Sequence, residues 1–178
     1  MARSAIDRRD HGEPARVEVT LTARPGVPAG KLLIPSPVEV DALVRRIPLG
    51  QVLVLGALRA SLARAHRADG ACPTTTAACV DVVGAAAEEE RGLGRGPVAP
   101  YWRLVHDDGA LIETLPGGLE AQARRLTAEG VTVLFLGKIP RVTEIGHFAW
   151  TPPPLAKRSM QAAASARVAA PPRRPPRR

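Results

Sequence analysis

The order of helix and strand signals is the feature that most constrains this chain. Three segments with apolar residues at helical spacing come first, within residues 37–90. Two short apolar runs separated by a tight turn follow within residues 101–115, and a fourth helical segment and a last strand complete the pattern. Helices followed by paired strands predict an α+β domain that is mainly α.

The first helix has a clear predicted start. Ser36 is suited to the cap, Pro37 to the first turn, and Glu39 to the reciprocal position of a capping box. Apolar residues then recur at helical spacing as far as Ile47. The second helix is predicted to begin at Gly56, after a short extended run.

The third helix is predicted to begin at one of three consecutive threonines, Thr74, Thr75 or Thr76, each of which can act as a cap. It runs to Glu90, and its last residues, 88–90, are all glutamates. Negative charge is unfavourable at this end of the helix dipole.

A strand is expected at residues 101–105, a tight turn at 107–109 and a returning strand at 110–115. A fourth helix follows Gly117 and Gly118. Two helices joined by a turn and followed by a β-hairpin form the outline of a winged helix-turn-helix, a DNA-binding architecture. A packed α+β domain without that role has the same outline.

Composition divides the chain into three parts. Residues 31–150 hold the helix and strand signals and are predicted to form the folded domain. Residues 1–30 read as a disordered or weakly ordered arm, in which the alternation at 17–22 allows a short strand. Residues 151–178 contain seven prolines, alanines and paired arginines, and are expected to form a disordered Pro/Arg-rich basic tail.

The positive charge belongs to the tail rather than to the domain. The formal net charge is +8, yet residues 157–178 hold seven basic residues and no acidic one. With one further positive charge in residues 1–30, residues 31–156 have a net charge of zero. A basic tail can bind any polyanion by releasing counterions, so it says little about what the domain does.

Several classes of protein are not expected. The chain has no apolar run of the ~18 residues that span a bilayer, and it begins without a secretory signal. Cys72 and Cys79 lie seven apart with no clustered His, so neither a disulfide framework nor a metal site is predicted. No cofactor is indicated, and a cytoplasmic location is the expectation.

One constellation of residues forms a recognisable motif: Pro100-Tyr101-Trp102-Arg103-Leu104-Val105, Asp108-Gly109, Gly117-Gly118, Leu126 and Glu129-Gly130, with Ile47-Pro48-Leu49-Gly50-Gln51-Val52 upstream. It resembles the DNA-binding and active-site domain of DNA alkyltransferases, which repair guanine alkylated on its exocyclic oxygen. Their signature reads Pro-Cys-His-Arg-Val-Val, then a Gly turn, Gly-Gly, and a helix that ends in Glu-Gly. A bacterial subgroup that carries Pro-Tyr-Trp-Arg is the most similar, over residues 32–130.

The resemblance implies that the repair chemistry is absent. In the family a Cys thiolate attacks the alkyl group, and a neighbouring His held by a Glu takes its proton. Tyr101 stands at the Cys position and Trp102 at the His position, while Glu129 matches the Glu. A phenol with a pKa near ~10 is a poor substitute for a thiolate, and indole is not a base. We therefore expect no enzyme and no catalytic residue.

Residues with which the family handles DNA are also replaced. Leu55 stands where the family has a Tyr that helps to turn the nucleotide out. The place of its Arg finger falls at Val80 or Asp81, and Gly96-Pro97 replaces a hinge Asn. The fold is thus expected to carry over better than the DNA function.

Two groups of candidate site residues follow from the resemblance. Tyr101 and Trp102 either line a pocket and stack on a base, or fill that pocket as core. Arg103 is interpreted as structural, and Glu129 completes this candidate base pocket.

The candidate DNA contacts are Thr74, Thr75 and Thr76 at a helix start, which either bind phosphate or act as ordinary caps, together with Gly117 and Gly118.

The leading hypothesis is a non-catalytic alkyltransferase-like DNA-binding protein linked to DNA repair or its regulation. Its expected partners are DNA, including alkylated DNA, and a repair protein, and the expected state is a monomer. The alternative is a protein-interaction module that kept the fold and lost specific DNA binding.

Overall fold

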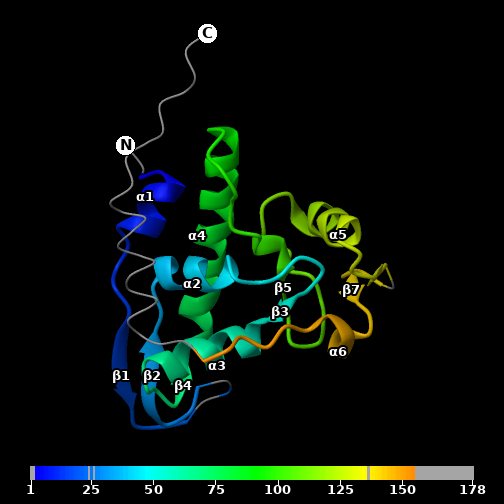
Figure 1. Cartoon of the computed structure of the whole chain (residues 1–178). Coiled ribbons are helices and arrows are strands. Elements are labelled where there is room, and N and C mark those ends of the chain that lie inside the picture. The colour runs from blue at the N-terminus through cyan, green and yellow to red at the C-terminus, as the bar shows by residue number, and fades with distance from the viewer. Residues whose placement is uncertain (1–2, 24, 26, 136, 155–178) are drawn as a thin grey trace.

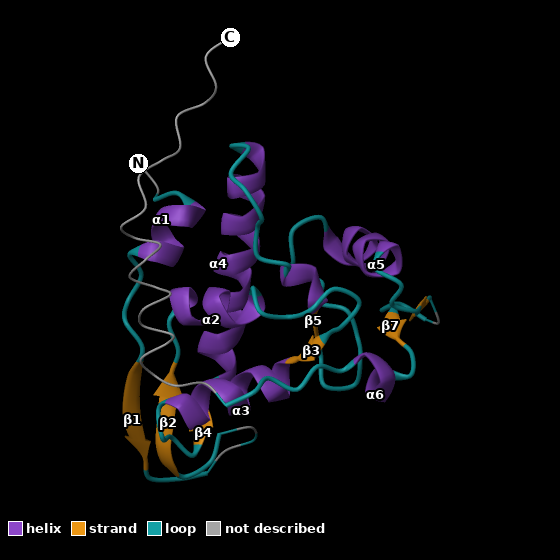
Figure 2. Cartoon of the chain, in the orientation of Figure 1, coloured by secondary structure: helices purple, strands orange, loops and turns teal. Residues whose placement is uncertain are grey.

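The computed structural model describes residues 3–23, 25, 27–135 and 137–154 (Figure 1). The helices are α1 (Ala5–Asp10), α2 (Pro37–Val44), α3 (Leu55–Ala65), α4 (Pro73–Gly92), α5 (Gly118–Ala128) and α6 (Ile145–Phe148), with a 3-10 turn, η1, at Tyr101–Arg103. The strands are β1 (Arg16–Thr20), β2 (Gly30–Ile34), β3 (Leu53–Val54), β4 (Gly70–Ala71), β5 (Leu104–Val105), β6 (Val133–Leu134) and β7 (Arg141–Val142). The fold is α+β and mainly helical, which confirms the prediction (Figure 2). None of the described helices is long and apolar enough to cross a membrane.

The strands form three small sheets. β1 pairs antiparallel with β2, with Arg16 opposite Ile34, and β2 pairs parallel with β4. β3 pairs parallel with β5, with Leu53 opposite Leu104, and β6 pairs antiparallel with β7. The β3–β5 pair positions the candidate site, because β5 directly follows η1.

Helix α4 is the longest described element and stands upright in Figure 1. It packs against α1, α2 and η1. Its buried face carries small side chains, among them Val83, Gly84 and Ala87. A Cβ atom at Gly84 would lie 2.8 Å from Cδ of Pro116, so the close approach of the segment before α5 depends on this glycine.

The buried apolar residues form two clusters. The larger one joins β2, α2, α3 and α4, and includes Leu33, Leu58 and Val83. The smaller one lies around α5 and includes Leu126. Trp102 packs against both clusters, so this side chain lies where the two halves of the core meet.

The N-terminal arm is more ordered than the sequence predicts. Helix α1 packs on α4 and α2, and the backbone N–H groups of Ala5 and Ile6 donate to the Glu89 carboxylate at 2.8 and 3.2 Å. The short strand expected at 17–22 is present as β1. In the predicted tail, residues 155–178 lie outside the described residues.

The helix starts differ in detail from the predictions. Ser36 is the cap of α2, but its side chain makes no capping hydrogen bond. Glu39 instead pairs with Nε2 of His66 at 3.1 Å, so the capping box is wrong. Helix α4 begins at Pro73 with Cys72 as its cap, ahead of the three threonines. Helix α3 begins one residue before the expected start.

The predicted hairpin at residues 101–115 is wrong. β5 pairs with β3, and the segment after the turn forms no strand beside it. The physical reason is the buried Gln122 of α5. Its amide oxygen accepts from the N–H of Ile112 at 2.9 Å, and its amide nitrogen donates to the carbonyls of Trp102 and Leu104 at 3.0 and 2.7 Å. One side chain thus takes the place of a strand ladder. The turn itself is present, with Gly109 at a φ of 80°.

Candidate functional site

The 3-10 turn η1 presents three consecutive side chains in three directions. The N–H of Tyr101 donates to the carbonyl of Ala99 at 2.8 Å, and the N–H of Arg103 donates to that of Pro100 at 3.0 Å. Successive residues of a 3-10 helix are turned by about 120°. Tyr101, Trp102 and Arg103 therefore leave the turn toward different neighbours, and η1 packs against both α4 and α5.

Tyr101 is closed off from solvent. Its side chain is 1% exposed, and its hydroxyl donates to Oε1 of Glu88 at 2.6 Å. Nη1 of Arg125 donates to the same hydroxyl at 2.7 Å, and Nη2 of Arg125 donates to Glu88 at 3.0 Å. The three groups form a closed triangle between η1, α4 and α5.

The charges of this triangle favour a neutral phenol. Burial raises the pKa of Tyr101 far above its usual value, and the hydrogen bond to the Glu88 carboxylate adds to the rise. Burial opposes ionisation of Glu88 too, but the hydrogen bonds from Tyr101 and Arg125 outweigh it and lower the pKa of Glu88. Tyr101 is thus a neutral hydrogen-bond donor in this triangle.

Glu129, at the C-terminal end of α5, is the acceptor at the centre of the site. Its carboxylate accepts hydrogen bonds from Nε1 of Trp102 at 2.8 Å and from Nε and Nη2 of Arg103 at 2.7 and 2.9 Å. The backbone N–H of Gly50 approaches it at 3.5 Å, and Nη1 of Arg103 donates to the carbonyl of Ile47 at 2.6 Å. Two segments that are distant in sequence, residues 47–50 and 102–103, therefore converge on the carboxylate of a third.

The ionised form of Glu129 is favoured by these contacts. Burial by itself would raise its pKa. The hydrogen bonds from Arg103 and Trp102 outweigh the burial and lower the pKa below its usual value of 4.5. Glu129 is consequently a fixed negative charge that orients both donors.

The rings are packed against each other and covered by a guanidinium. Tyr101 and Trp102 meet edge to face, with centroids 5.5 Å apart and an interplanar angle of 79°. The Arg125 guanidinium carbon lies 4.8 Å from the Trp102 ring centroid and 5.3 Å from that of Tyr101. Tyr101 is fully buried, whereas Trp102 is only half-buried.

The structure brings Tyr101, Trp102, Arg103 and Glu129 together, as predicted from the resemblance. Binding of a base by this cluster stays a prediction. Arg103 is structural in the sense expected, because it ties a carbonyl and a carboxylate.

The three threonines have three different environments. Thr76 is buried, and its hydroxyl donates to the carbonyl of Cys72 at 2.6 Å. The Thr75 hydroxyl donates to the Cys72 sulfur at 3.3 Å, and Thr74 is exposed. Since Cys72 is the cap, the expectation that a threonine caps this helix is wrong. Only Thr74 retains a hydroxyl open to a phosphate among the three.

Gly117 and Gly118 shape the start of α5. Both are in the left-handed region, with φ of 83° and 67°. A Cβ atom at Gly117 would lie 2.6 Å from Cβ of Ala121. The glycine pair is therefore required by the turn, and its proposed contact with DNA stays a prediction.

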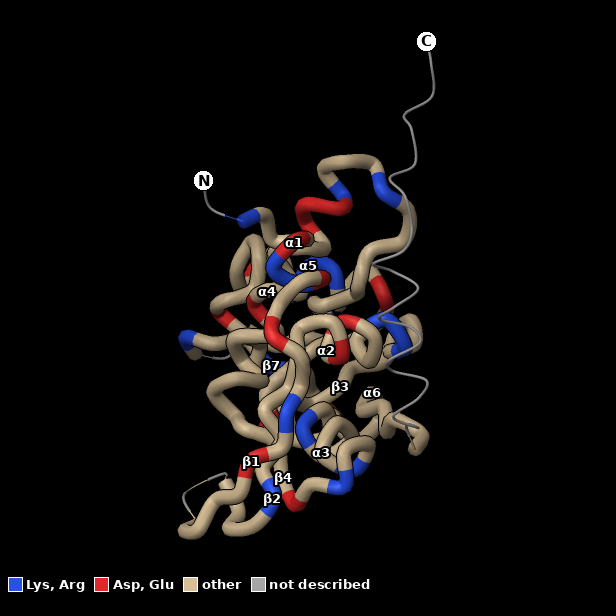
Figure 3. Tube along the Cα trace, turned by 90° about the vertical axis from the view of Figure 1, so that its left-hand side faces the viewer, with Lys and Arg blue, Asp and Glu red and all other residues tan. Residues whose placement is uncertain are grey.

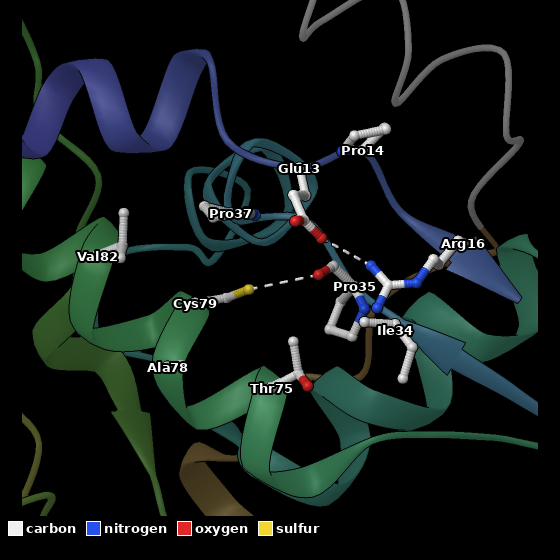
Figure 4. A pocket seen from close by; sticks show the side chains of 10 residues that line it. All are labelled: Glu13, Pro14, Arg16, Ile34, Pro35, Pro37, Thr75, Ala78, Cys79 and Val82. Carbon is white, nitrogen blue, oxygen red and sulfur yellow. Dashed lines mark hydrogen bonds and ion pairs between the residues drawn. The ribbon is translucent and has the colours of Figure 1, made fainter. Parts of the chain in front are cut away.

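Cys79 is not suited to act as a substitute nucleophile. Cys79 lies beside a cavity of about 200 Å³ between the arm, β2 and α4, and its thiol donates to the carbonyl of Pro35 at 3.5 Å (Figure 4). Burial raises the pKa of Cys79 to about 12, with the Glu39 charge adding to the rise. Its thiolate is therefore scarce at neutral pH. No group of three or more His, Cys, Asp or Glu side chains that could hold a metal occurs within the described part of the chain.

The candidate site residues predicted from the sequence do not include three residues that organise the site: Glu88, Gln122 and Arg125. One signal did point to Glu88. A carboxylate at the unfavourable end of a helix dipole requires a cationic or donor partner. The partner itself, Arg125, lies 37 residues further along and could not be identified from the pattern.

No protein-family model matches the chain, and no curated protein matches it. Two solved structures are similar. One is a crystal structure of S. pombe Atl1 in complex with damaged DNA containing O6-carboxymethylguanine, with 19% identity, a TM-score of 0.45, and coverage of 65% of this chain and 94% of that chain. The other is a crystal structure of S. pombe ATL in complex with DNA, with 20% identity, a TM-score of 0.48 and the same coverage of both chains, 65% and 94%. Both are Atl1 alkyltransferase-like proteins.

Proposed function

We propose that this chain is a non-catalytic alkyltransferase-like DNA-binding protein linked to DNA repair. The observation that carries the proposal is the convergence on Glu129 of Trp102, Arg103 and the backbone of Gly50. These residues come from the three segments whose sequences resemble DNA alkyltransferases. The fragments of the motif therefore act as one site.

The proposed loss of chemistry rests on two substitutions. Where the family has a His held by a Glu, Trp102 donates its indole N–H to Glu129 at 2.8 Å. The hydrogen bond to the carboxylate is of the same kind, but the lone pair of the indole nitrogen belongs to the aromatic ring and cannot take a proton. Where the family has a Cys, the buried Tyr101 donates to Glu88. Neither a base nor a reactive nucleophile remains at these positions.

The proposed DNA-binding part is the helix-turn-helix formed by α3, β4 and α4. In such motifs one helix enters a groove and the other lies along the backbone. The exposed Thr74 near the N-terminus of α4 is suited to contact a phosphate. The half-buried Trp102 is the aromatic ring best placed to meet a base, once Arg125 moves aside.

The alternative, a protein-interaction module, is favoured by the closed Glu88–Tyr101–Arg125 triangle. A base would have to displace Arg125, which bonds both to Tyr101 and to Glu88. Zero net charge over residues 31–156 also gives the domain no overall attraction for DNA.

Binding of the full-length chain to two matched duplexes separates the alternatives. The duplexes have one sequence and differ only in a single O-alkylated guanine, and the titrations are made over a salt series. The full chain is required, because cutting at residue 31 would remove α1 and β1. We expect binding to both duplexes, tighter binding to the alkylated one, and an unchanged protein mass. Equal affinity for both duplexes, or no binding at all, would favour the interaction module.

A further inference from the structure

We infer that the end of α3 carries a contact surface for DNA phosphates, formed by Arg64 and Arg67 and bordered by Arg59. This α3 arginine surface rests on the proposed function and gives the folded domain its own phosphate contacts, separate from the basic tail. In Figure 3 the chain around α3 carries several basic positions on the lower part of the molecule.

The first observation is the backbone of Arg67. Its φ is 54°, in the left-handed region that glycine adopts without steric cost. It follows the C-cap His66, and the N–H of Ala68 donates to the carbonyl of Ala63 at 2.9 Å, the closing bond of a helix end that usually contains glycine. An arginine thus occupies a position where glycine would be less strained.

The described structure gives the Arg67 side chain no fold-stabilising role. The side chain is exposed, and among the described residues it has no hydrogen bond or ion pair. Arg64, in the last turn of α3, is also exposed and has no such partner in the described chain. Two guanidinium groups without a partner among the described residues therefore lie close together in sequence at the end of α3.

This pattern contrasts with that of three arginines elsewhere in the domain. Arg45 bonds to Asp41 and Glu90, Arg103 bonds to Glu129, and Arg125 bonds to Glu88. Those guanidinium groups are neutralised within the fold. The free pair at the end of α3 is available for a phosphodiester, whose two oxygens suit a guanidinium group.

The second observation is a hollow beside Arg59 and Arg64. A cavity of about 260 Å³ is bordered by Arg59 and Arg64. Arg59 is held loosely, with Nη2 at 3.3 Å from Asp107. Asp69 also lines the cavity, and its carboxylate accepts from the backbone N–H of Lys31 at 2.7 Å. The remaining lining residues are small: Ala60, Ala63, Ala68, Gly70 and Ala71. Because these lining residues are small, a DNA phosphate group can approach the cavity closely.

The test uses full-length chains and an unmodified duplex, titrated over a salt series. The variants are Arg64→Ala, Arg67→Gly and Arg67→Lys, with Arg95→Ala as control. Arg95 is exposed and follows the far end of α4, roughly 30 Å from its N-terminus at 1.5 Å per residue. Arg64→Ala and Arg67→Gly should each weaken binding about fivefold at ~0.15 M salt and reduce the salt slope by about 0.9.

Arg67→Gly should also raise the midpoint of thermal unfolding, because it relieves the left-handed strain. Gain of stability together with loss of affinity is a result that a merely structural residue cannot give. Arg67→Lys should keep the slope, and Arg95→Ala should leave the affinity within twofold of wild type. Wild-type affinity and slope in Arg67→Gly and Arg64→Ala would overturn the inference while leaving the proposed function standing. Absence of DNA binding by the wild-type chain would instead overturn the proposed function.

Discussion

Replacing Glu129 with Gln tests the geometry of the site most directly. Glutamine keeps the size of the side chain and one oxygen, but it loses the charge that Arg103 and Trp102 share. The carboxylate accepts three hydrogen bonds from these two side chains, at 2.7 to 2.9 Å. The Arg103 side chain is 11% exposed, so the variant leaves a mostly buried cation without its counter-charge.

The expected cost is about 3 kcal/mol of unfolding free energy. Removing one partner of a buried ion pair costs roughly 3–5 kcal/mol. We use the lower end of that range, because the amide oxygen of glutamine can still accept a hydrogen bond. In a chain of this size, about 3 kcal/mol corresponds to a fall of roughly 6–12 °C in Tm. Urea unfolding at pH 7 measures the free energy. Glu120→Gln, on the exposed side of the same helix, is the matched control and should stay within about 0.5 kcal/mol of wild type.

The pH dependence supplies a second, independent readout. The folded-state pKa of Glu129 is lowered below 4.5, because the bonds from Arg103 and Trp102 outweigh its burial. A lowered folded pKa means that the stabilisation is complete above the ordinary value and is lost as the pH falls below it. The difference in unfolding free energy between wild type and Glu129→Gln should therefore shrink as the pH falls into the acid range. A gap that is independent of pH, or a variant as stable as Glu120→Gln, would refute the reasoning.

Three further outcomes are expected. Intact-mass measurement after incubation with O-alkylated guanine in DNA should show no added alkyl group, and a stoichiometric gain on Tyr101, Cys72 or Cys79 would contradict this. Deleting residues 157–178, with their seven basic charges, should reduce the salt slope of duplex binding by up to roughly 6, and an unchanged slope would place all binding on the folded domain. Trp102→Ala should lower stability by about 3 kcal/mol in urea unfolding, because the ring packs against both core clusters. An unchanged stability with a lost preference for alkylated DNA would show that Trp102 faces an open base pocket.

The features that could be predicted from sequence are those set by neighbours along the chain. Pro37 marks the first turn of α2, as expected from its place after a capping residue. Gly117 is the cap of α5 and Gly118 is its first residue, because only glycine takes their left-handed backbone easily. The assembly of Trp102 with Glu129 could be anticipated because the motif pairs those two positions.

The features that could not be predicted depend on partners far along the chain. The predicted returning strand does not form, because the N–H of Ile112 donates to the side-chain oxygen of Gln122. A strand pattern in the sequence does not reveal this hydrogen bond. The arm is ordered because Glu89 receives the first N–H groups of α1, more than 80 residues earlier. Apolar periodicity reports which residues are buried, but it does not report which polar groups pair.

The three consecutive glutamates of α4 show how such pairing reverses a sequence argument. By dipole alone, Glu88, Glu89 and Glu90 oppose the helix end, at a cost of about 0.3–1 kcal/mol each. Residues of an α-helix are turned by about 100° from one to the next, so the three carboxylates leave in different directions. Each meets its own donors, and a charged hydrogen bond contributes about 1.5–3 kcal/mol, more than the dipole costs.

Those donors tie three parts of the molecule to one turn of α4. Glu88 bonds to Tyr101 of the candidate site, Glu89 holds the start of α1, and Glu90 bonds to Arg9 and to Arg45 at the end of α2. Losing α1 would leave Glu89 without the N–H groups that it binds and Glu90 without one of its two arginines, directly beside the carboxylate that orients Tyr101. The N-terminal arm is therefore part of the framework that positions the site, although it lies outside the alkyltransferase-like motif.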